Sequence, residues 1–281
     1  MARLCNCSLR AVISALGKKQ NWYYYKARIR DRTPKIKKPE VMEMIHRLVK
    51  LRPGTYGYRR IHAILRLLRI PCNGKTVNRY MGLNLLLSTN RQKRRQRGRI
   101  HEGTVAVTDP NKRWASDITV IKAWNGDKGR LAVIIDCADR QVVAYRWSRR
   151  ITGETLVEVV KEALLKRFDG FVVPEKGSLE FLSDNGPEFI EKNFRKFLEQ
   201  AGFTVCNTPI RSPESNGIAE SFFKSLKRDY VYQSVNMDFD ETGRNIVKWL
   251  EDYNTRAPHS ALGMLTPAKF YENWKEKTSK K

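Results

Sequence analysis

Three acidic residues in the second half of the chain have positions that suit metal-dependent chemistry. Asp117 lies inside an apolar, strand-like run, Asp184 ends another such run, and Glu220 lies early in a helix-like segment. Asp is depleted in β-strands, and the carboxyl ends of strands are where α/β sheets place their ligands. Mg²⁺ prefers oxygen ligands, and two such ions about 4 Å apart can stabilise both the attacking and the leaving oxygen of a phosphoryl transfer. The three residues therefore predict a metal-dependent catalytic site.

Glu220 lies at the boundary between two faces of its expected helix. At 100° per residue, Glu220, Lys224 and Lys227 share one face. A carboxylate followed by cations one and two turns along the helix suits a site that binds phosphate groups, so we interpret Lys224 and Lys227 as DNA contacts. The neighbouring face is apolar and contains Ala219, Phe222, Phe223, Leu226 and Tyr230.

Each acidic residue also has a simple structural interpretation. Asp117 could satisfy a local hydrogen bond, Asp184 could belong to a plain turn with the following Asn-Gly, and Glu220 could be one exposed helical charge. Taken singly, each of these interpretations would be preferred. Taken together, these simple interpretations become less convincing, because three acidic residues occur in the expected order on the expected strands and helix. We assign Trp114 to core packing, and His259 could either act on DNA or cap a helix.

The elements that must position these residues predict a mixed α/β sheet. Three sequential runs rich in β-branched and aromatic residues, separated by turn residues, predict an antiparallel meander. The order β-β-β-α-β-α-β-α predicts a mixed five-stranded sheet flanked by helices. The expected strands are 113–124, 130–137, 141–147, 178–183 and 203–207, and the expected helices are 152–168, 187–201 and one from about 216.

A small all-helical module is expected upstream, over residues 40–88. Apolar residues recur there at helical spacing, and Pro-Gly at 53–54 and Asn-Gly at 73–74 separate three short helices. Short helices joined by tight turns are typical of a helix-turn-helix-like DNA-binding unit. Its third helix would present Lys75, Asn78 and Arg79 to DNA, unless these residues are only the solvated face of a structural bundle.

Positive charge is concentrated in the first 112 residues. The net charge is +25, and residues 1–112 hold 27 of the 54 Lys and Arg but 5 of the 29 Asp and Glu. Neutralising phosphates releases counterions and gives strong, salt-sensitive binding, so nucleic acid is the expected partner. In the basic linker over residues 89–112, we expect Arg94, Arg95 and Arg97 to track DNA phosphates, the alternative being a solvated tether.

Further sequence features indicate the compartment and the division of the chain. There is no membrane-spanning apolar run and no signal-peptide pattern, and five scattered cysteines make a disulfide framework unexpected. We therefore expect a cytoplasmic protein without a membrane partner. The predicted division is an N-terminal segment 1–38 with a helix over 9–27, the helical module 40–88, the linker 89–112 and the catalytic core 113–275.

Five strings in this order resemble the second-reading-frame (OrfB-type) transposases of bacterial insertion sequences, within the retroviral-integrase superfamily. The gap of 35 residues between Asp184 and Glu220 matches that superfamily's Asp, Asp, Glu signature, and the motif match at Asp117 leaves Asp136 out of the site. The strings are Tyr56-Gly57-Tyr58-Arg59-Arg60-Ile61, Arg113-Trp114-Ala115-Ser116-Asp117, Ser183-Asp184-Asn185-Gly186, Ser212-Pro213-Glu214-Ser215-Asn216-Gly217, and Tyr253-Asn254 through Thr266-Pro267.

The resemblance implies a ribonuclease H-like core and a DNA transposase that cleaves transposon ends and transfers the freed 3′-hydroxyl to target DNA. It implies two Mg²⁺ or Mn²⁺ ions on Asp117, Asp184 and Glu220. It also implies a homo-oligomer on DNA, a first-reading-frame product as a further partner, and a nucleoid-associated location in a bacterial cytoplasm. The four histidines lack the pairing of an integrase zinc module, so zinc is not expected.

The sequence leaves open both the role of the loop before the Glu220 helix and the exact activity of the protein. Arg211 and Asn216 could touch the substrate or serve only the loop. A nuclease with the same fold that cuts without joining would use the same three acids. A non-catalytic DNA-binding remnant of a transposase is the second alternative, which the intact set of acids disfavours.

Overall fold

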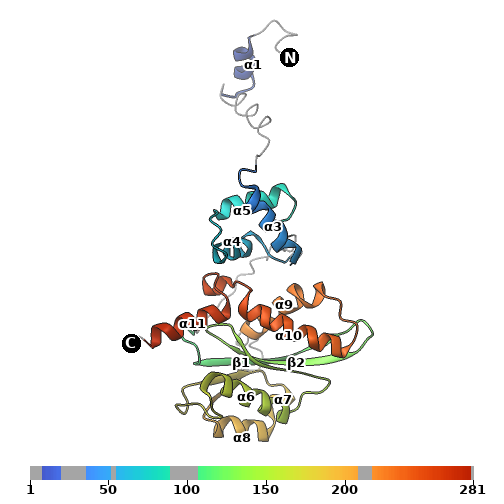
Figure 1. The fold of residues 1–281 in the computed structure, drawn as a ribbon, viewed down its shortest axis with the longest axis vertical. Helices are drawn as coiled ribbons and strands as arrows, with labels where there is room; N and C mark the ends of the chain where they lie inside the picture. The colour runs from blue at the N-terminus through green and yellow to red at the C-terminus, as the bar shows by residue number, and fades with distance from the viewer. Residues whose placement is uncertain (1–7, 20–35, 52–54, 89–106, 208–216, 280–281) are drawn as a thin grey trace.

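Three parts follow one another along the chain: a short N-terminal helix, a three-helix module and a mixed α/β core (Figure 1). The computed structural model describes residues 8–19, 36–51, 55–88, 107–207 and 217–279. Within these ranges, no helix is long and apolar enough to cross a membrane.

The N-terminal helix α1 spans Leu9–Ala15 and ends well before the expected boundary at residue 27. The Ser8 side chain caps its start by accepting a hydrogen bond from the backbone N–H of Ala11 at 3.3 Å. Gly17 follows the helix with a φ of 63°. Glycine readily adopts this left-handed conformation, which commonly ends α-helices, so the predicted helix was too long.

The module contains the three predicted helices, α3 (Pro39–Leu51), α4 (Tyr58–Leu67) and α5 (Gly74–Leu83). Asn73 caps α5 by accepting from the backbone N–H of Lys75 at 2.8 Å. Helical spacing of the apolar residues predicts that Leu68 is buried, but it lies just past the end of α4 and is exposed. The buried core consists of Val41, Met42, Ile45, Tyr56, Ile61, Leu65, Val77, Tyr80 and Met81.

The core is built on one mixed five-stranded sheet, which confirms the predicted fold class. The strand order is β3-β2-β1-β4-β5. The first three strands are antiparallel, whereas β4 runs parallel to β1 and β5 runs parallel to β4. The strands are β1 (Arg113–Lys122), β2 (Lys128–Asp136), β3 (Val142–Ser148), β4 (Glu180–Ser183) and β5 (Thr204–Asn207).

Helices cover both faces of this sheet (Figure 1). One face packs against α6, α7 and α8 around Trp114, which is completely buried, as expected for a core residue. The opposite face packs against α9 and α10. The helices of the core are α6 (Gly153–Phe168), α7 (Pro187–Ile190), α8 (Lys192–Gln200), α9 (Gly217–Asp229), α10 (Phe239–Thr255) and α11 (Pro267–Thr278), with short 3₁₀ turns η1 (Val231–Gln233) and η2 (Ser260–Leu262).

The single helix predicted over residues 187–201 is interrupted at Glu191. This residue has a ψ of 130°, which is extended backbone, and it separates α7 from α8. Its carboxylate accepts a hydrogen bond from the backbone N–H of Gly153, the first residue of α6, at 2.9 Å. The carboxylate occupies the space that a Cβ at Gly153 would need. The break between α7 and α8 therefore coincides with a contact to the start of α6, which the spacing of apolar residues within 187–201 does not reveal.

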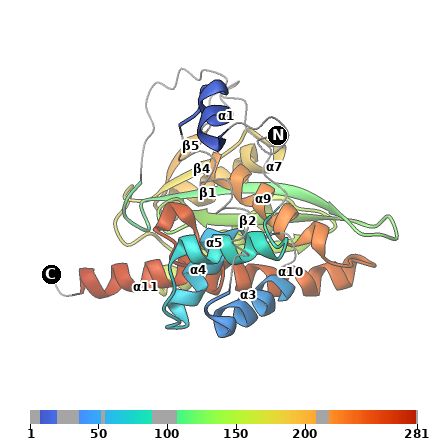
Figure 2. The same ribbon diagram turned by 90° about the horizontal axis from the view of Figure 1, so that it is seen from above.

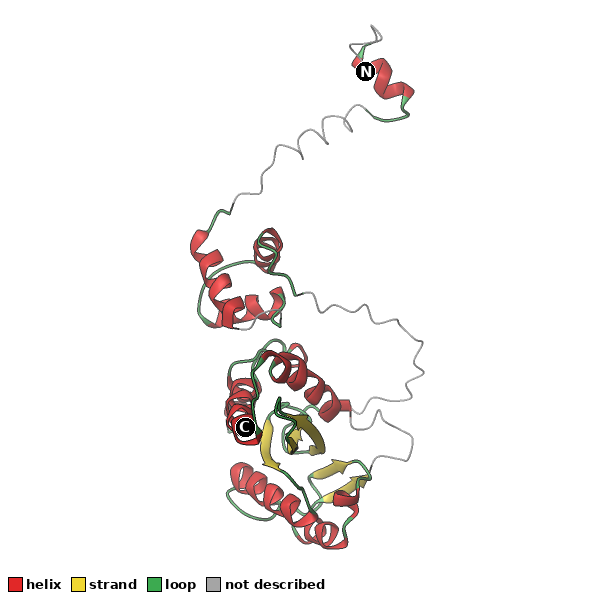
Figure 3. Cartoon of the chain, turned by 90° about the vertical axis from the view of Figure 1, so that its right-hand side faces the viewer, coloured by secondary structure: helices red, strands yellow, loops and turns green. Residues whose placement is uncertain are grey.

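An ion pair joins the helical module to the core. Arg60 on α4 donates to Asp229 at the end of α9 at 2.9 Å, and the two side chains are 24% and 4% exposed. Arg228 also pairs with Asp229. Figures 1 and 3 show the module on the side of the core that carries α9 and α10, and Figure 2 views the same arrangement from above.

Arg60→Ala is expected to loosen the module from the core. A hydrogen bond to a charged group contributes about 1.5–3 kcal/mol. Arg228 still pairs with Asp229 in the variant and compensates for part of the lost bond, but both residues lie on α9, so this pair does not hold the module. Hydrogen–deuterium exchange should therefore increase in α4 and at the end of α9. Arg59→Ala, which removes an exposed neighbouring cation, is the control. Equal exchange in both variants would contradict a docking role for Arg60.

Candidate active site

The sheet register places Asp117 and Asp184 side by side. β1 and β4 are parallel neighbours in which Ala115 lies opposite Leu182. Two residues further along each chain, Asp117 is level with Asp184, which directly follows β4. Side chains two residues apart on a strand face the same side of the sheet. Asp117 therefore lies on the face where Ala115 packs with α9.

Glu220 reaches the same face from the first turn of α9. This helix is held on the sheet by Ala219 and Phe222, which share a buried cluster with Ala115. The predicted division of α9 into apolar and charged faces is correct, because Glu220 is half-buried between the apolar side and exposed Lys224. The tertiary structure thus brings one residue from each of three distant segments to one end of the sheet.

The electrostatics of Asp117 reflect this proximity. Burial, and then the negative charges of Asp184 and Glu220, raise the pKa of Asp117 to about 6. The backbone N–H of Ile118, which donates to Asp117 at 2.7 Å, and the nearby charge of Lys227 act in the opposite direction. The three carboxylates therefore repel one another, and a cation between them would relieve that repulsion.

Each carboxylate nevertheless has a local partner in this structure. Asp117 accepts from the N–H of Ile118, Asp184 accepts from the N–H of Gly186 at 3.0 Å, and Glu220 pairs with Lys224 at 3.5 Å. Within the described ranges, no three His, Cys, Asp or Glu side chains form a group that could hold a metal ion. The set fits a divalent cation by its chemistry and its location, while the side chains would have to turn toward one another to hold one.

Divalent-metal affinity is expected to fall as the pH drops through 6. A carboxylate must be ionised to bind a metal, and Asp117 with a pKa of about 6 is mostly protonated at about pH 5. Mn²⁺ titration calorimetry should show a loss of affinity of roughly tenfold between about pH 7 and about pH 5. A constant affinity over this interval would contradict a role for Asp117 as a ligand.

Asp117→Asn is expected to stabilise the metal-free protein near neutral pH. The folded-state pKa of about 6 lies above the unfolded value of about 4, so ionisation of Asp117 lowers stability as the pH rises through that interval. The variant should gain about 2–4 °C in Tm, the shift produced by 1 kcal/mol in a domain of this size, at about pH 7 and none at about pH 4. Asp240→Asn, at an exposed position, is the control and should show neither change.

The structure places the expected DNA contacts in different surroundings. Lys224 is exposed, and Lys227 is half-buried and close enough to Asp117 to lower its pKa. On α5, the expected reading residues Lys75, Asn78 and Arg79 are all exposed. The other expected contacts, Arg94, Arg95, Arg97, Arg211 and Asn216, lie outside the described residues.

Asp136 and His259, which the sequence analysis also considered, are held by contacts inside the core. Asp136 is completely buried and accepts from the backbone N–H groups of Asn111, Ala138 and Asp139 at 2.7, 2.8 and 3.2 Å. His259 packs edge-on against the Tyr253 ring at 4.6 Å between centroids. Its burial, followed by the charge of Arg60, lowers its pKa to about 4. His259 occupies the N-cap position of η2, although its side chain makes no capping hydrogen bond there.

Two exposed aromatic residues near Lys227 were missed by the sequence analysis. Trp124, at the turn between β1 and β2, is 70% exposed, and Tyr232 in η1 is 73% exposed. Both line a cavity of about 450 Å³ that Lys227 also lines. The available sequence signal was an aromatic residue directly before the Asn125-Gly126 turn, where side chains are usually small or polar.

Comparisons with known proteins find matches to the α/β core and to the helical module. An integrase core domain model matches residues 107–213, a second integrase core domain model matches residues 201–267, and an HTH-like domain model matches residues 37–94. Among curated relatives, an uncharacterized protein of insertion element IS136 from Agrobacterium fabrum is 41% identical over 62% of this chain and 90% of its own length. Transposase InsD of insertion element IS2 from Escherichia coli is 38% identical over 82% of this chain and 78% of its own length.

Solved structures similar to this chain include the HTLV-2 integrase catalytic core domain in complex with magnesium. It is 22% identical, with a TM-score of 0.41, and the match covers 59% of this chain and 99% of that one.

Proposed function

This chain belongs to the insertion-element transposases that carry an integrase core domain, and we propose that it cleaves the ends of its element and joins them to target DNA. In cleavage, a water oxygen forms a bond to phosphorus and the bond to the 3′ oxygen breaks, which leaves a 3′-hydroxyl. In joining, that hydroxyl oxygen attacks a target phosphodiester, loses its proton, and displaces another 3′ oxygen.

One observation carries this proposal: Asp117, Asp184 and Glu220, from three separate elements, lie at the same end of one face of the sheet. The raised pKa of Asp117 follows from its burial and from the other two carboxylates. A cluster of like charges destabilises the fold, and acids perturbed in this way are concentrated at functional sites. A perturbed acid in such a cluster is therefore a candidate for the catalytic centre.

Asp117, Asp184 and Glu220 are the residues that would hold Mg²⁺ or Mn²⁺, with two ions expected. When bound, such ions stabilise charge on the attacking and leaving oxygens. The chain's own task is to position the DNA phosphates, while the N–H of Ile118 and the charge of Lys227 favour the ionised form of Asp117. Lys224 and Lys227, one and two turns after Glu220 on α9, are suited to bind those phosphates because they lie on the same side of the helix.

The division of the chain suggests separate roles for its parts. We assign element-end recognition to the module over residues 40–88, through Lys75, Asn78 and Arg79, and catalysis to residues 113–275. The linker 89–112 would add phosphate contacts that carry no sequence information. Assembly as a homo-oligomer on DNA, cooperation with a first-reading-frame product and a nucleoid-associated cytoplasmic location belong to the same proposal.

The decisive experiment is incubation of the protein with labelled DNA from the ends of its element, an unlabelled target and Mn²⁺. Nicked and joined products are separated on denaturing gels, with EDTA as the control. Products of both kinds that depend on Mn²⁺ are the expected result. Nicks without joining at saturating target DNA would favour the nuclease alternative. Binding without any product would favour a non-catalytic DNA-binding protein.

A further inference from the structure

A cavity that Lys227 of α9 lines lies between the β1–β2 hairpin and the segment that leads into α10. Figure 1 shows these two segments meeting at the same end of the sheet. The volume of about 450 Å³ is within the range of roughly 300–1,000 Å³ that is typical of ligand sites. Its described lining consists of Val120, Ile121, Lys122, Trp124, Lys227, Val231, Tyr232, Ser234 and Asn236.

The walls of this cavity are held by hydrogen bonds. The backbone N–H groups of Trp124 and Asn125 donate to the carbonyls of Asn236 and Met237 at 2.8 and 3.1 Å, which ties the hairpin tip to the segment before α10. The Asn236 side chain is buried and donates to the carbonyl of Val231 at 3.1 Å. The cavity therefore exists without a ligand, and a ligand would not have to order it.

The chemistry of the lining favours a nucleotide. Trp124 and Tyr232 keep most of their surface in solvent and line the same cavity, and exposed apolar side chains that gather in one place mark binding sites. Aromatic rings bind unstacked bases of any sequence, because every base has a π-face. Lys122 and Lys227 supply two cations, and none of the described lining residues is acidic. This charge complements a phosphate backbone.

Lys227 connects the cavity to Asp117. It lines the cavity from α9, and it is close enough to Asp117 to lower that residue's pKa. A DNA strand with a phosphate on Lys227 would therefore have one neighbouring nucleotide near Asp117 and another near the two aromatic rings.

We propose that this cavity binds an unpaired nucleotide of the DNA strand that is being processed. The base would stack on Trp124 or Tyr232, and its backbone phosphate would pair with Lys227. This assignment rests on the proposed function, because it takes DNA as the substrate. It adds that the DNA next to the reacting phosphate must be unpaired by at least one nucleotide.

The test compares the affinities for two DNA probes in EDTA, so that cleavage plays no part. One probe is a blunt duplex of mixed sequence, and the other is the same duplex with a short thymidine tail. Stacking contributes about 1–3 kcal/mol per base, so Trp124→Ala and Tyr232→Ala should each weaken binding of the tailed duplex by roughly 5- to 150-fold. Their affinity for the blunt duplex should stay within about twofold of wild type, since phosphate contacts are retained.

Phe171→Ala is the matched control, because Phe171 is an exposed aromatic residue in a different part of the core. It should bind both probes like wild type. Equal affinities of wild type, Trp124→Ala and Tyr232→Ala for the tailed duplex would overturn the proposal. So would a change in self-association instead of DNA affinity, which would identify a protein-binding surface.

A photochemical experiment on the unmutated protein gives an independent readout. Thymidines in the tail are replaced by 5-iododeoxyuridine, and cross-linked peptides are identified by mass spectrometry after irradiation. Cross-links at Trp124 or Tyr232 are expected, and cross-links confined to other aromatics contradict the proposal. Neither binding nor cross-linking requires catalysis. A protein that fails to cut and join but passes these tests would therefore refute the catalytic proposal and leave the nucleotide site standing.

Discussion

Asp117→Asn, Asp184→Asn and Glu220→Gln are each expected to lower DNA cleavage and joining by about a thousandfold or more. Metal ions contribute several kcal/mol of charge stabilisation to a phosphoryl-transfer transition state, and about 4 kcal/mol corresponds to a thousandfold in rate. Each substitution replaces an anionic ligand by a neutral amide of nearly the same shape. The loss should therefore appear in the rate of product formation with Mn²⁺ or Mg²⁺.

DNA binding by the three variants should be nearly unchanged, because phosphate and base contacts lie on other residues. Filter binding at fixed salt measures this, since such affinities depend strongly on salt concentration. Asp240→Asn removes an exposed carboxylate from the first turn of α10 and should keep normal joining. Near-normal joining by any of the three variants would show that the altered residue is not a metal ligand.

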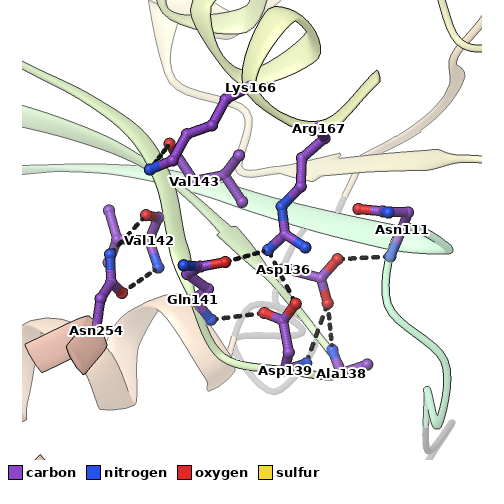
Figure 4. A network of polar contacts seen from close by, with 10 residues as sticks. All are labelled: Asn111, Asp136, Ala138, Asp139, Gln141, Val142, Val143, Lys166, Arg167 and Asn254. Atoms are coloured by element: carbon purple, nitrogen blue, oxygen red, sulfur yellow. Dashed lines mark hydrogen bonds and ion pairs between the residues drawn. The ribbon is translucent and has the colours of Figure 1, made fainter. Parts of the chain in front are cut away.

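The second large effect is expected from a buried ion pair beneath the sheet edge. Arg167 donates to Asp139 at 2.9 Å, with the two side chains 1% and 0% exposed, and it also donates to Gln141 at 2.9 Å (Figure 4). The Tyr271 ring of α11 lies 3.9 Å from the guanidinium carbon. Asp136, also completely buried, lies beside this pair. The charge of Arg167 thus compensates the negative charges of two buried acids.

Arg167→Leu is expected to lower the free energy of unfolding by about 3–5 kcal/mol, because it leaves a buried carboxylate without its partner. Burial and the neighbouring Asp136 raise the pKa of Asp139, and Arg167 opposes both. Without the cation, the ionised form of Asp139 is still less favourable. Since ionisation increases with pH, the loss should be larger at about pH 8 than at about pH 5 in urea unfolding.

Two further variants isolate the charge effect of Arg167. Adding Asp139→Asn to Arg167→Leu removes the unpaired charge, so the double variant should recover part of the lost stability, and most of the pH dependence of the loss should disappear. Lys161→Leu removes an exposed cation from the same helix and should change stability by less than about 1 kcal/mol. A loss in Arg167→Leu that does not vary with pH would show that lost packing, not charge, causes it.

The sequence predicted most elements of the fold because their patterns are local. Runs rich in β-branched and aromatic residues marked β1 to β3, and α6 starts as expected directly after Thr152, whose hydroxyl accepts from the backbone N–H of Thr155. Helical spacing identified the three helices of the module. Where a distant contact or a local backbone conformation intervened, prediction failed: Glu191 interrupts a helix while bonding to Gly153, and Gly17 ends α1 early.

The candidate site likewise has features that the sequence predicted and features that it could not predict. The residue types of Asp117, Asp184 and Glu220 and the elements that carry them were readable from the chain. Their proximity depends on the parallel register of β1 and β4 and on the packing of α9 against the sheet. Local pattern could not assign Trp124 and Tyr232 to one cavity either, because that cavity depends on hydrogen bonds between the hairpin tip and a segment more than a hundred residues later.

By itself, the sequence determined which segments become strands and helices and which side chains are available for chemistry, because periodicity, capping and turn residues act over a few neighbouring positions. Only the tertiary structure decided which of these side chains meet. The pairing of Arg60 with Asp229, the burial of Asp139 with Arg167 and the electrostatic coupling of the three acids all join residues far apart in the chain. Such contacts form only when whole layers pack together, since their free energy comes from burial that no local segment achieves alone.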